Sequence, residues 1–241
     1  MSRLGFLVKG ELDRLNKYNL FTATSVVLLI WIGLAWLLDV DELMMFIPII
    51  LLMDTTMMTI VLVGATMFYE KKEHTVNSIL VSPVREDEYL ISKVIVNIIN
   101  SMITLIALSI AVYFMKDVTF NYLLATGAVV VITAVHTVIG IWLTYYAKKF
   151  SSMLVNYIIY IFAFLVPTVL AMLEVIGEQA ANFLIILPPD ASLTLLNAIF
   201  NDVEPWRVIF GFAYLLALTV IIYKFVVKPK LNDYAMRETG V

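Results

Sequence analysis

The stretch MMFIPIILLMDTTMMTIVLVGATMF, residues 44–68, has 25 residues, of which only Asp54 is charged. A helix that crosses a bilayer needs about 20 apolar residues, so this run is long enough to span a membrane. Five further apolar runs of 18 to 26 residues occur at 21–38, 94–115, 122–147, 153–173 and 206–227. Hydrophobic residues make up 62% of the 241 residues and charged residues 15%, whereas soluble domains have about 45–50% and 25%. The sequence therefore predicts an all-α polytopic membrane protein, with six transmembrane helices in a single transmembrane domain over residues 1–241.

The segments between these runs limit the class of function. The longest of them, 174–205, has 32 residues, and chains shorter than about 40 residues rarely fold without help. We therefore expect no separate soluble catalytic domain. The chain has no cysteine, which excludes disulfides and cysteine metal sites, and we expect it to bind no metal.

The basic residues predict the orientation in the membrane. With a cytoplasmic N-terminus and six crossings, 14 Lys and Arg residues lie on the cytoplasmic side, and two, Lys116 and Arg207, lie outside. The acidic residues outside the spans divide evenly, nine and nine. The positive-inside rule counts basic residues and largely ignores acidic ones, so we expect both termini to be cytoplasmic.

Two segments outside the spans are expected to lie along the membrane surface. In residues 1–20, Leu4, Leu7, Val8, Leu12 and Leu15 recur at helical spacing, which favours an amphipathic helix in the inner interface over a frayed charged tail. Segment 174–205 contains the apolar stretch 183–200, broken by Pro188 and Pro189. It is too short to cross twice, and a single crossing would move the C-terminal basic residues outside. We expect a re-entrant pair of short outer helices, with an exposed loop as the alternative.

The loop FYEKKEHTVNSILVSPVREDEYLISK, residues 68–93, has charged residues at both ends and an apolar centre. A short helix there would rest Val76, Ile79 and Leu80 on another surface and end before Pro83. A solvated linker would not need such a face, whereas a helix presented to a cytoplasmic partner would. We therefore interpret 69–93 as a docking loop.

The residues of this loop carry a resemblance to a known family. Their order is Glu70-Lys71, Thr75, Ile79-Leu80-Val81, Ser82-Pro83, Glu88-Tyr89 and Lys93. It resembles the first cytoplasmic loop of ABC transporter type-2 permeases, with a pattern like E-x-x-x-x-T-x-x-x-L-x-x-x-P…K. The resemblance extends over the whole chain, to the interfacial helix, the six spans and the paired outer helices. The subgroup that it resembles most is small bacterial drug-export permeases, including fluoroquinolone exporters.

This resemblance implies a site, partners and a cell membrane location, in a bacterium. It makes 69–93 the coupling loop that docks on an ABC ATP-binding subunit, through Glu70, Thr75, Val76, Ile79, Leu80, Val81, Ser82, Pro83, Glu88 and Lys93. It also implies a second permease copy or paralogue, contact with membrane lipid, a small amphipathic substrate and no nucleic acid. None of the nine glycines is followed by lysine, so the phosphate-binding G-x-x-x-x-G-K-[ST] motif is absent. We therefore expect no cofactor on this chain, with ATP and Mg held by a separate ATPase.

Asp54 is the acidic residue within a predicted span. It is ten residues into that span, which places it about 15 Å deep at ~1.5 Å per residue, where an aspartate costs roughly 2.5–3.5 kcal/mol on insertion. By the same rise, His136 lies about 21 Å deep in the fourth span, close enough to permit a pair. Asp54 either lines a substrate pathway and selects cationic or zwitterionic substrates, takes up a proton, or ties helices together. Other candidate pathway residues are Thr55, Thr59, Asn97 and Asn100, and the asparagines, with Ser101 and Thr104, equally fit interhelical hydrogen bonding.

The sequence thus favours the permease subunit of an ATP-driven exporter of drug-like substrates. An ABC-type exporter of peptides or lipids, giving immunity, is the first alternative. The second, of a different class, is an intramembrane enzyme that uses Asp54 and His136. No H-E-x-x-H or G-x-S-x-G motif supports this enzyme.

Overall fold

The computed structural model describes residues 2–80, 82–177 and 182–236, and their secondary structure is entirely helical. Within these residues, six helices are long and apolar enough to cross a membrane, with a mean hydropathy of 2.1 to 2.2 in their best windows. Their bounds are Leu20–Leu37, Val40–Lys72, Glu86–Lys116, Tyr122–Tyr145, Phe150–Met172 and Pro205–Met236. The all-helical architecture and the six long apolar helices confirm this part of the prediction and are those of a polytopic membrane protein.

Several of these long helices are built from shorter elements. The first, third and fourth are α2 (Leu20–Leu37), α6 (Glu86–Lys116) and α7 (Tyr122–Tyr145). The second joins α3 (Val40–Met53), the π-helical turn η1 (Asp54–Met58) and α4 (Thr59–Lys72). The fifth joins α8 (Phe150–Tyr160), the π-turn η2 (Ile161–Leu165) and α9 (Val166–Met172), and the sixth joins α12 (Pro205–Ile222), the π-turn η4 (Tyr223–Val227) and α13 (Lys228–Met236).

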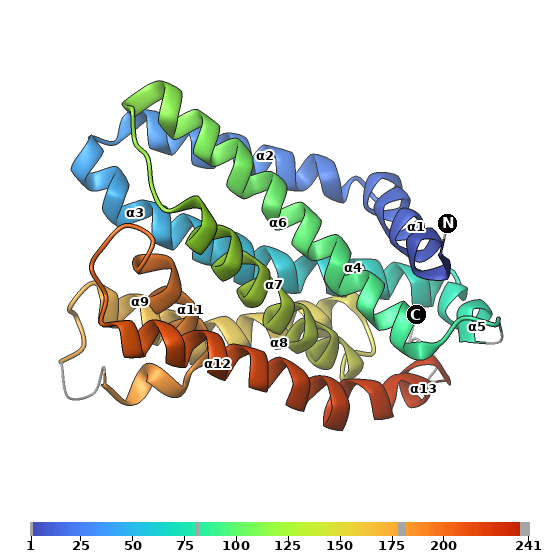
Figure 1. Ribbon diagram of the computed structural model, residues 1–241. Coiled ribbons are helices and arrows are strands. Elements are labelled where there is room, and N and C mark those ends of the chain that lie inside the picture. Colours follow the sequence, from blue (N-terminus) through green and yellow to red (C-terminus); the bar gives the residue numbers. More distant parts are fainter. Residues whose placement is uncertain (1, 81, 178–181, 237–241) are drawn as a thin grey trace.

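The second and fourth long helices form the centre of the bundle. In their most apolar windows 67% and 72% of the residues are buried, against 11% in α2 and 17% in the last long helix. Figure 1 shows α7 between α6 on one side and α8 and α12 on the other. The outer helices therefore leave their apolar faces uncovered, as lipid contact requires.

Two glycines allow the central helices to approach closely. A Cβ on Gly140 of α7 would lie 2.6 Å from Val63 Cγ1 and 3.1 Å from the backbone of Ile60 in α4. A Cβ on Gly64 would lie 1.5 Å from the hydroxyl of Tyr157 in α8. That hydroxyl is 2.8 Å from Thr144 Oγ1 of α7, so Gly64 makes room for a hydrogen bond that joins α7 to α8.

Among its described residues, the segment between the fifth and sixth long helices contains two short helices. They are the 3₁₀ helix η3 (Asn182–Ile186) and α11 (Pro188–Asn197). Pro188 and Pro189 occupy the first positions of α11, where they need no intrahelical N–H partner. α11 packs against α3, α7 and α12, with Ala191, Leu195 and Leu196 almost fully buried. The break at the prolines agrees with the sequence pattern, and α11 is covered by protein rather than being an exposed loop.

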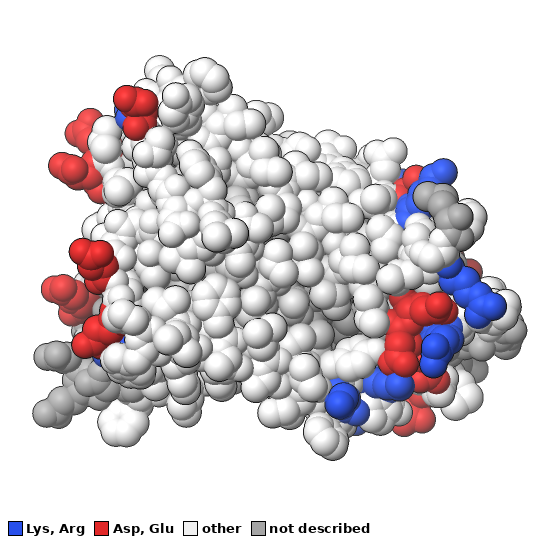
Figure 2. Space-filling model, viewed as in Figure 1, with Lys and Arg blue, Asp and Glu red and all other residues white. Residues whose placement is uncertain are grey.

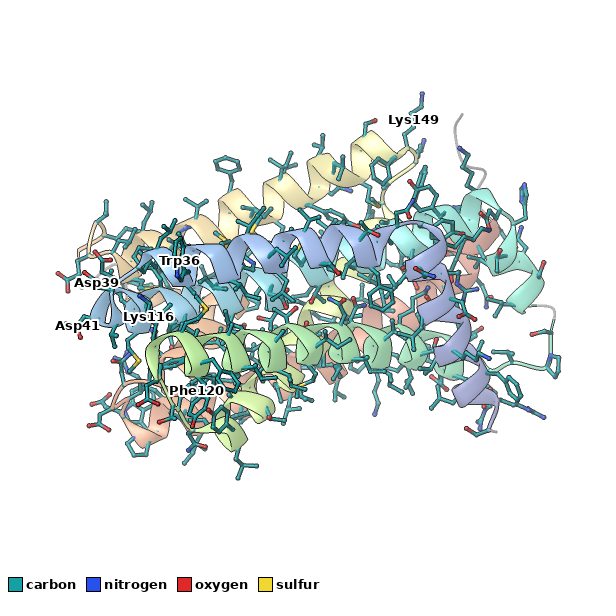
Figure 3. All side chains as sticks on the ribbon, turned by 90° about the horizontal axis from the view of Figure 1, so that it is seen from above. Trp36, Asp39, Asp41, Lys116, Phe120 and Lys149 are labelled. Atoms are coloured by element: carbon teal, nitrogen blue, oxygen red, sulfur yellow. The ribbon has the colours of Figure 1, made fainter. Side chains whose placement is uncertain are left out.

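The two ends of the bundle differ in charge. At one end, which we call the basic end, lie α1 (Arg3–Lys17), the short helix α5 (Thr75–Leu80) and α13 (Figure 1). We call the opposite end the acidic end, because its charged side chains are mostly Asp and Glu (Figure 2). Figure 3 places Asp39, Asp41 and Lys116 at the acidic end and Lys149 towards the basic end. The orientation in the membrane was predicted from the excess of Lys and Arg at one end of the bundle.

We expect the substitution Gly64→Ala to destabilise the protein by about 1–3 kcal/mol, the usual cost of overpacking. The new methyl group would overlap the Tyr157 hydroxyl and displace it from Thr144. Thermal unfolding of the purified protein in detergent measures the effect. Gly33→Ala is the matched control, because Gly33 is also in a span and nothing lies within 4 Å of its would-be Cβ. Equal melting temperatures for the two variants would contradict this account of the packing.

Candidate functional site

The loop between α4 and α6 folds back on the permease instead of extending from it. α5 packs against α4 and α13, and Val76 is 1% exposed. Ile79 is half-buried against the main apolar core. The opposite face of α5 carries Asn77 and Ser78, which are both exposed. The apolar side chains of the loop therefore hold α5 in place, and the polar side faces outward.

Beneath this loop lies a group of four charged side chains, Glu11, Arg14, Glu70 and Lys93, which we call the ionic cluster. Lys93 Nζ is 2.8 Å from Glu11 Oε1 and 2.7 Å from Glu70 Oε2. Arg14 Nη2 is 2.9 Å from Glu11 Oε1, and its Nε is 2.9 Å from Glu70 Oε1. The cluster joins α1, the end of α4 and the beginning of α6.

Three of the four side chains of the ionic cluster are almost fully buried, and Arg14 is 18% exposed. Glu11, Glu70 and Lys93 are 2%, 0% and 2% exposed, and the Tyr89 hydroxyl donates a 2.7 Å hydrogen bond to Glu70 Oε2. Burial alone raises the pKa of the Glu11 carboxyl, but Lys93 and Arg14 outweigh it and lower that pKa to about 2. Two acids and two bases give the cluster no net charge. Its stability depends on this balance, because a single buried ion without a partner is very costly.

Contacts around the rim attach the loop to both ends of the chain. Lys17 Nζ of α1 lies 2.8 Å from Glu73 Oε1, and Lys71 Nζ donates a 2.6 Å hydrogen bond to the carbonyl oxygen of Tyr234 in α13. At the start of α6, Asp87 pairs with Lys228 at 2.9 Å. The rim contacts and the ionic cluster therefore make α1, the loop and α13 one continuous structure.

The structure brings some of the predicted coupling residues together and separates others. Glu70 and Lys93, the first and last residues of the motif, meet in the ionic cluster. Glu88 accepts a 2.9 Å hydrogen bond from the backbone of Arg85 at the start of α6. In the turn between α5 and α6, the Ser82 hydroxyl donates a 2.6 Å hydrogen bond to the Ile79 carbonyl oxygen at the end of α5. The Pro83 carbonyl oxygen accepts a 3.1 Å hydrogen bond from the Arg3 guanidinium. Val81 and the side chain of Leu80 lie outside the described residues, and Thr75 begins α5 half-buried.

The candidate pathway residues lie inside a single bundle. Asp54, Thr55, Thr59, Asn97, Asn100 and His136 are all at most 5% exposed. Asp54 Oδ1 accepts a 3.2 Å hydrogen bond from Thr104 of α6, so the polar stripe of α6 faces the π-turn η1. His136 Nδ1 forms a 2.8 Å hydrogen bond with the Ile132 carbonyl oxygen. The His136 and Tyr160 rings are in edge-to-face contact, with 6.2 Å between their centroids. Asp54 and His136 thus have separate partners.

Sequence reasoning missed Glu11, Arg14 and Tyr89 as members of the site. A signal for Glu11 was present: it falls on the apolar face of the first helix, in register with Leu4, Leu7 and Leu15. A lone acid on an apolar stripe indicates a buried partner. The sequence did not show which basic residue that partner would be.

Comparison with known proteins identifies the family of this chain. The fluoroquinolones export permease protein family matches residues 2–237. The chain belongs to that family. Two relatives, fluoroquinolones export permease proteins from strains CDC 1551 / Oshkosh and ATCC 25618 / H37Rv of Mycobacterium tuberculosis, are each 23% identical over 243 residues, covering 100% of both chains. No solved structure matches.

Family membership confirms the resemblance read from the loop and the layout of the spans. It makes the chain an export permease of the membrane, which implies a transporter rather than an enzyme. Both relatives are bacterial. The permease therefore belongs with multi-pass membrane transporters, and its ionic cluster is a candidate element of the transport machinery.

We expect Lys93→Met to destabilise the permease by about 3–5 kcal/mol, because it leaves two buried carboxylates with one cation. The double variant Glu11→Gln/Lys93→Met restores charge balance, with Arg14 facing Glu70, and should be more stable than Lys93→Met alone. Unfolding of the four proteins of this double-mutant cycle in detergent gives the coupling free energy. Losses that simply add would show that the four charges do not act as a unit.

Proposed function

We propose that this chain is the membrane subunit of an ABC exporter, driven by a separate ATPase and working as a pair of permease copies or paralogues. Family membership supports an export role. The absence of a G-x-x-x-x-G-K-[ST] motif from the sequence requires ATP and Mg to be bound elsewhere if transport is ATP-driven. In this proposal the basic end is cytoplasmic, as the positive-inside rule favours.

The observation that carries the coupling mechanism is the ionic cluster. Loop residues 71–92 are closed at their base by the Glu70–Lys93 pair, and α1 is tied to the same base through Glu11 and Arg14. A displacement of α5 by the ATPase would therefore move the ends of α4 and α6 together. Because α4 and α6 both pack on α7, the movement passes to the bundle as a rigid-body shift.

The ATPase would contact the outward face of α5 and the turn that follows it. Asn77, Ser78 and Pro83 are exposed there, and Lys72, Glu73 and Arg85 provide charges around them. Val76 and Ile79 act indirectly, since they hold α5 on α4 and α13. Charges at the rim of an interface mainly set orientation and association rate.

Co-purification from the native host in mild detergent tests this arrangement. We expect an ABC ATPase to accompany the tagged permease and to be lost, by about tenfold or more, in Asn77→Arg/Ser78→Arg, which blocks the outer face without disturbing the core. Asn201→Arg, an exposed asparagine at the acidic end, is the matched control and should retain the ATPase. If no ATPase co-purifies with the wild-type permease, the proposed function is wrong.

The polar interior between η1, α6 and α7 is the proposed route for polar parts of a drug-like amphipathic substrate, for which the relatives' names suggest fluoroquinolones. Within the described residues, none of the ion pairs involves Asp54, and Thr133 Oγ1 and His136 Nε2 have no hydrogen-bond partner. Buried polar atoms of this kind favour an additional partner such as water or a substrate group. Opening α6 away from η1 would expose Asp54 together with Asn97 and Asn100.

We expect Asp54→Asn to change the rate or selectivity of drug export while the ATPase still co-purifies and the melting temperature stays within a few degrees. The amide keeps the acceptor for Thr104 but removes the ionisable group. Efflux of a fluoroquinolone and of an uncharged drug from cells measures the effect at two pH values. Unchanged export of both drugs at both pH values would show that Asp54 serves only to join helices of the bundle.

A further inference from the structure

A cavity of about 300 Å³ lies at the acidic end, away from the ionic cluster and from Asp54. It is lined by residues of α9, η3, α11 and the start of α12, and it is partly open at the surface. This volume is at the lower limit of ligand-binding pockets, so it accommodates a small molecule or one end of a larger one. The family comparisons and the transport proposal assign nothing to it.

The walls of this cavity combine apolar and polar side chains. Ala171, Met172, Ile185 and Leu193 form the apolar part. The polar part consists of Thr168, Thr194, Asn197, Asp190 and Arg207. A pocket of this composition favours an amphipathic ligand with a polar group that points towards the charged side chains.

The charges at the cavity favour a cation. Among the described residues, Asp190 has no ion pair within 4 Å, whereas Arg207 is already paired with Glu204 at 3.2 Å. Arg207 also lies over the ring of Trp206, 5.4 Å from its centroid. The charged side chains seen at this end of the bundle are mostly acidic (Figure 2), which raises the local concentration of cations. Asp190 therefore has no salt bridge within 4 Å, and Arg207 attracts its carboxylate only from a greater distance.

We propose that this cavity binds the ammonium group of an amphipathic amine, with Asp190 as its counter-charge and Met172, Ile185 and Leu193 in contact with the apolar body. On the proposed function, which this inference extends, the cavity is an exit site on the outer side. Thr194 and Asn197 lie one and two turns along α11 from Asp190, on the same face, and supply oxygen acceptors for the remaining N–H groups.

Burial raises the pKa of Asp190 to about 6, although Arg207 opposes the rise. The carboxylate is the form that attracts an ammonium group, so binding is strongest well above this pKa and weakens as the pH falls through it. Between pH 7.5 and pH 5 the amine itself stays protonated. A loss of affinity over this interval therefore reports on Asp190.

Fluorescence titration with dansylcadaverine, a cationic amine, and with its neutral N-acetyl derivative tests the proposal. The full-length permease is held in phosphatidylcholine nanodiscs, and the signal of empty nanodiscs is subtracted. We expect the amine to bind about tenfold or more tightly than the acetylated probe at pH 7.5, as for a charge-assisted hydrogen bond. In Asp190→Asn this preference and the pH dependence should both disappear.

Two further variants distinguish the cavity from surface charge. Asp41→Asn removes an acidic residue at the same end but outside the cavity (Figure 3) and should leave the preference unchanged. Arg207→Gln removes a positive charge from the wall and should strengthen amine binding. Equal affinities of the wild-type protein for both probes, or an equal loss in Asp41→Asn and Asp190→Asn, would overturn the proposal.

The outcome is independent of the ATPase experiment. Asp190→Asn should not change co-purification of the ATPase, because the cavity and α5 lie at opposite ends of the bundle. Amine binding without an associated ATPase would retain the site and reject the exporter mechanism. If the ATPase co-purifies but the permease shows no preference for the amine, the exporter mechanism is retained and the amine site is rejected.

Discussion

Four charged side chains, three of them almost fully buried, lie together where α1, α4 and α6 meet, and the arrangement of the basic end depends on their mutual neutrality. Each carboxylate of the ionic cluster contacts both cations, and each cation contacts both carboxylates. Removing any one charge leaves an uncompensated ion among largely buried side chains, a much larger loss than that of an exposed salt bridge. The geometry of the docking loop is therefore fixed by electrostatics at its base, while apolar contacts of α5 fix its tip.

The sequence predicted the long helices well, because a transmembrane helix can be recognised in a single sequence as an uninterrupted run of apolar residues. It also identified Glu70 and Lys93 as the ends of the loop, through the resemblance of the motif. It could not pair them with Glu11 and Arg14, since that contact depends on where α1 lies relative to α6. The orientation of α5 was equally hidden: an apolar face such as Val76 and Ile79 has the same pattern whether it covers a partner or the chain itself.

The interior of the bundle shows a second limit of sequence reasoning. Gly64 and Gly140 have no distinctive spacing, yet they set how closely α4 approaches α7 and α8. The polar stripe of α6 was visible from its three- and four-residue spacing, and its hydrogen bond to Asp54 places it against η1. Its position in the bundle follows from packing, whereas a role in transport would require α6 and η1 to separate.

The contacts that hold the loop differ in their exposure to dissolved ions. The Lys17–Glu73 and Lys228–Asp87 pairs have side chains that are 37–60% exposed, within reach of counter-ions whose screening length is about 8 Å at physiological ionic strength. The ionic cluster is shielded from them. Rising ionic strength should therefore loosen the loop from α1 and α13 at its periphery first, while the junction of α1, α4 and α6 stays intact. The outer contacts of loop 69–93 should thus respond to the salt content of the surrounding solution, whereas the ionic cluster at its base should not.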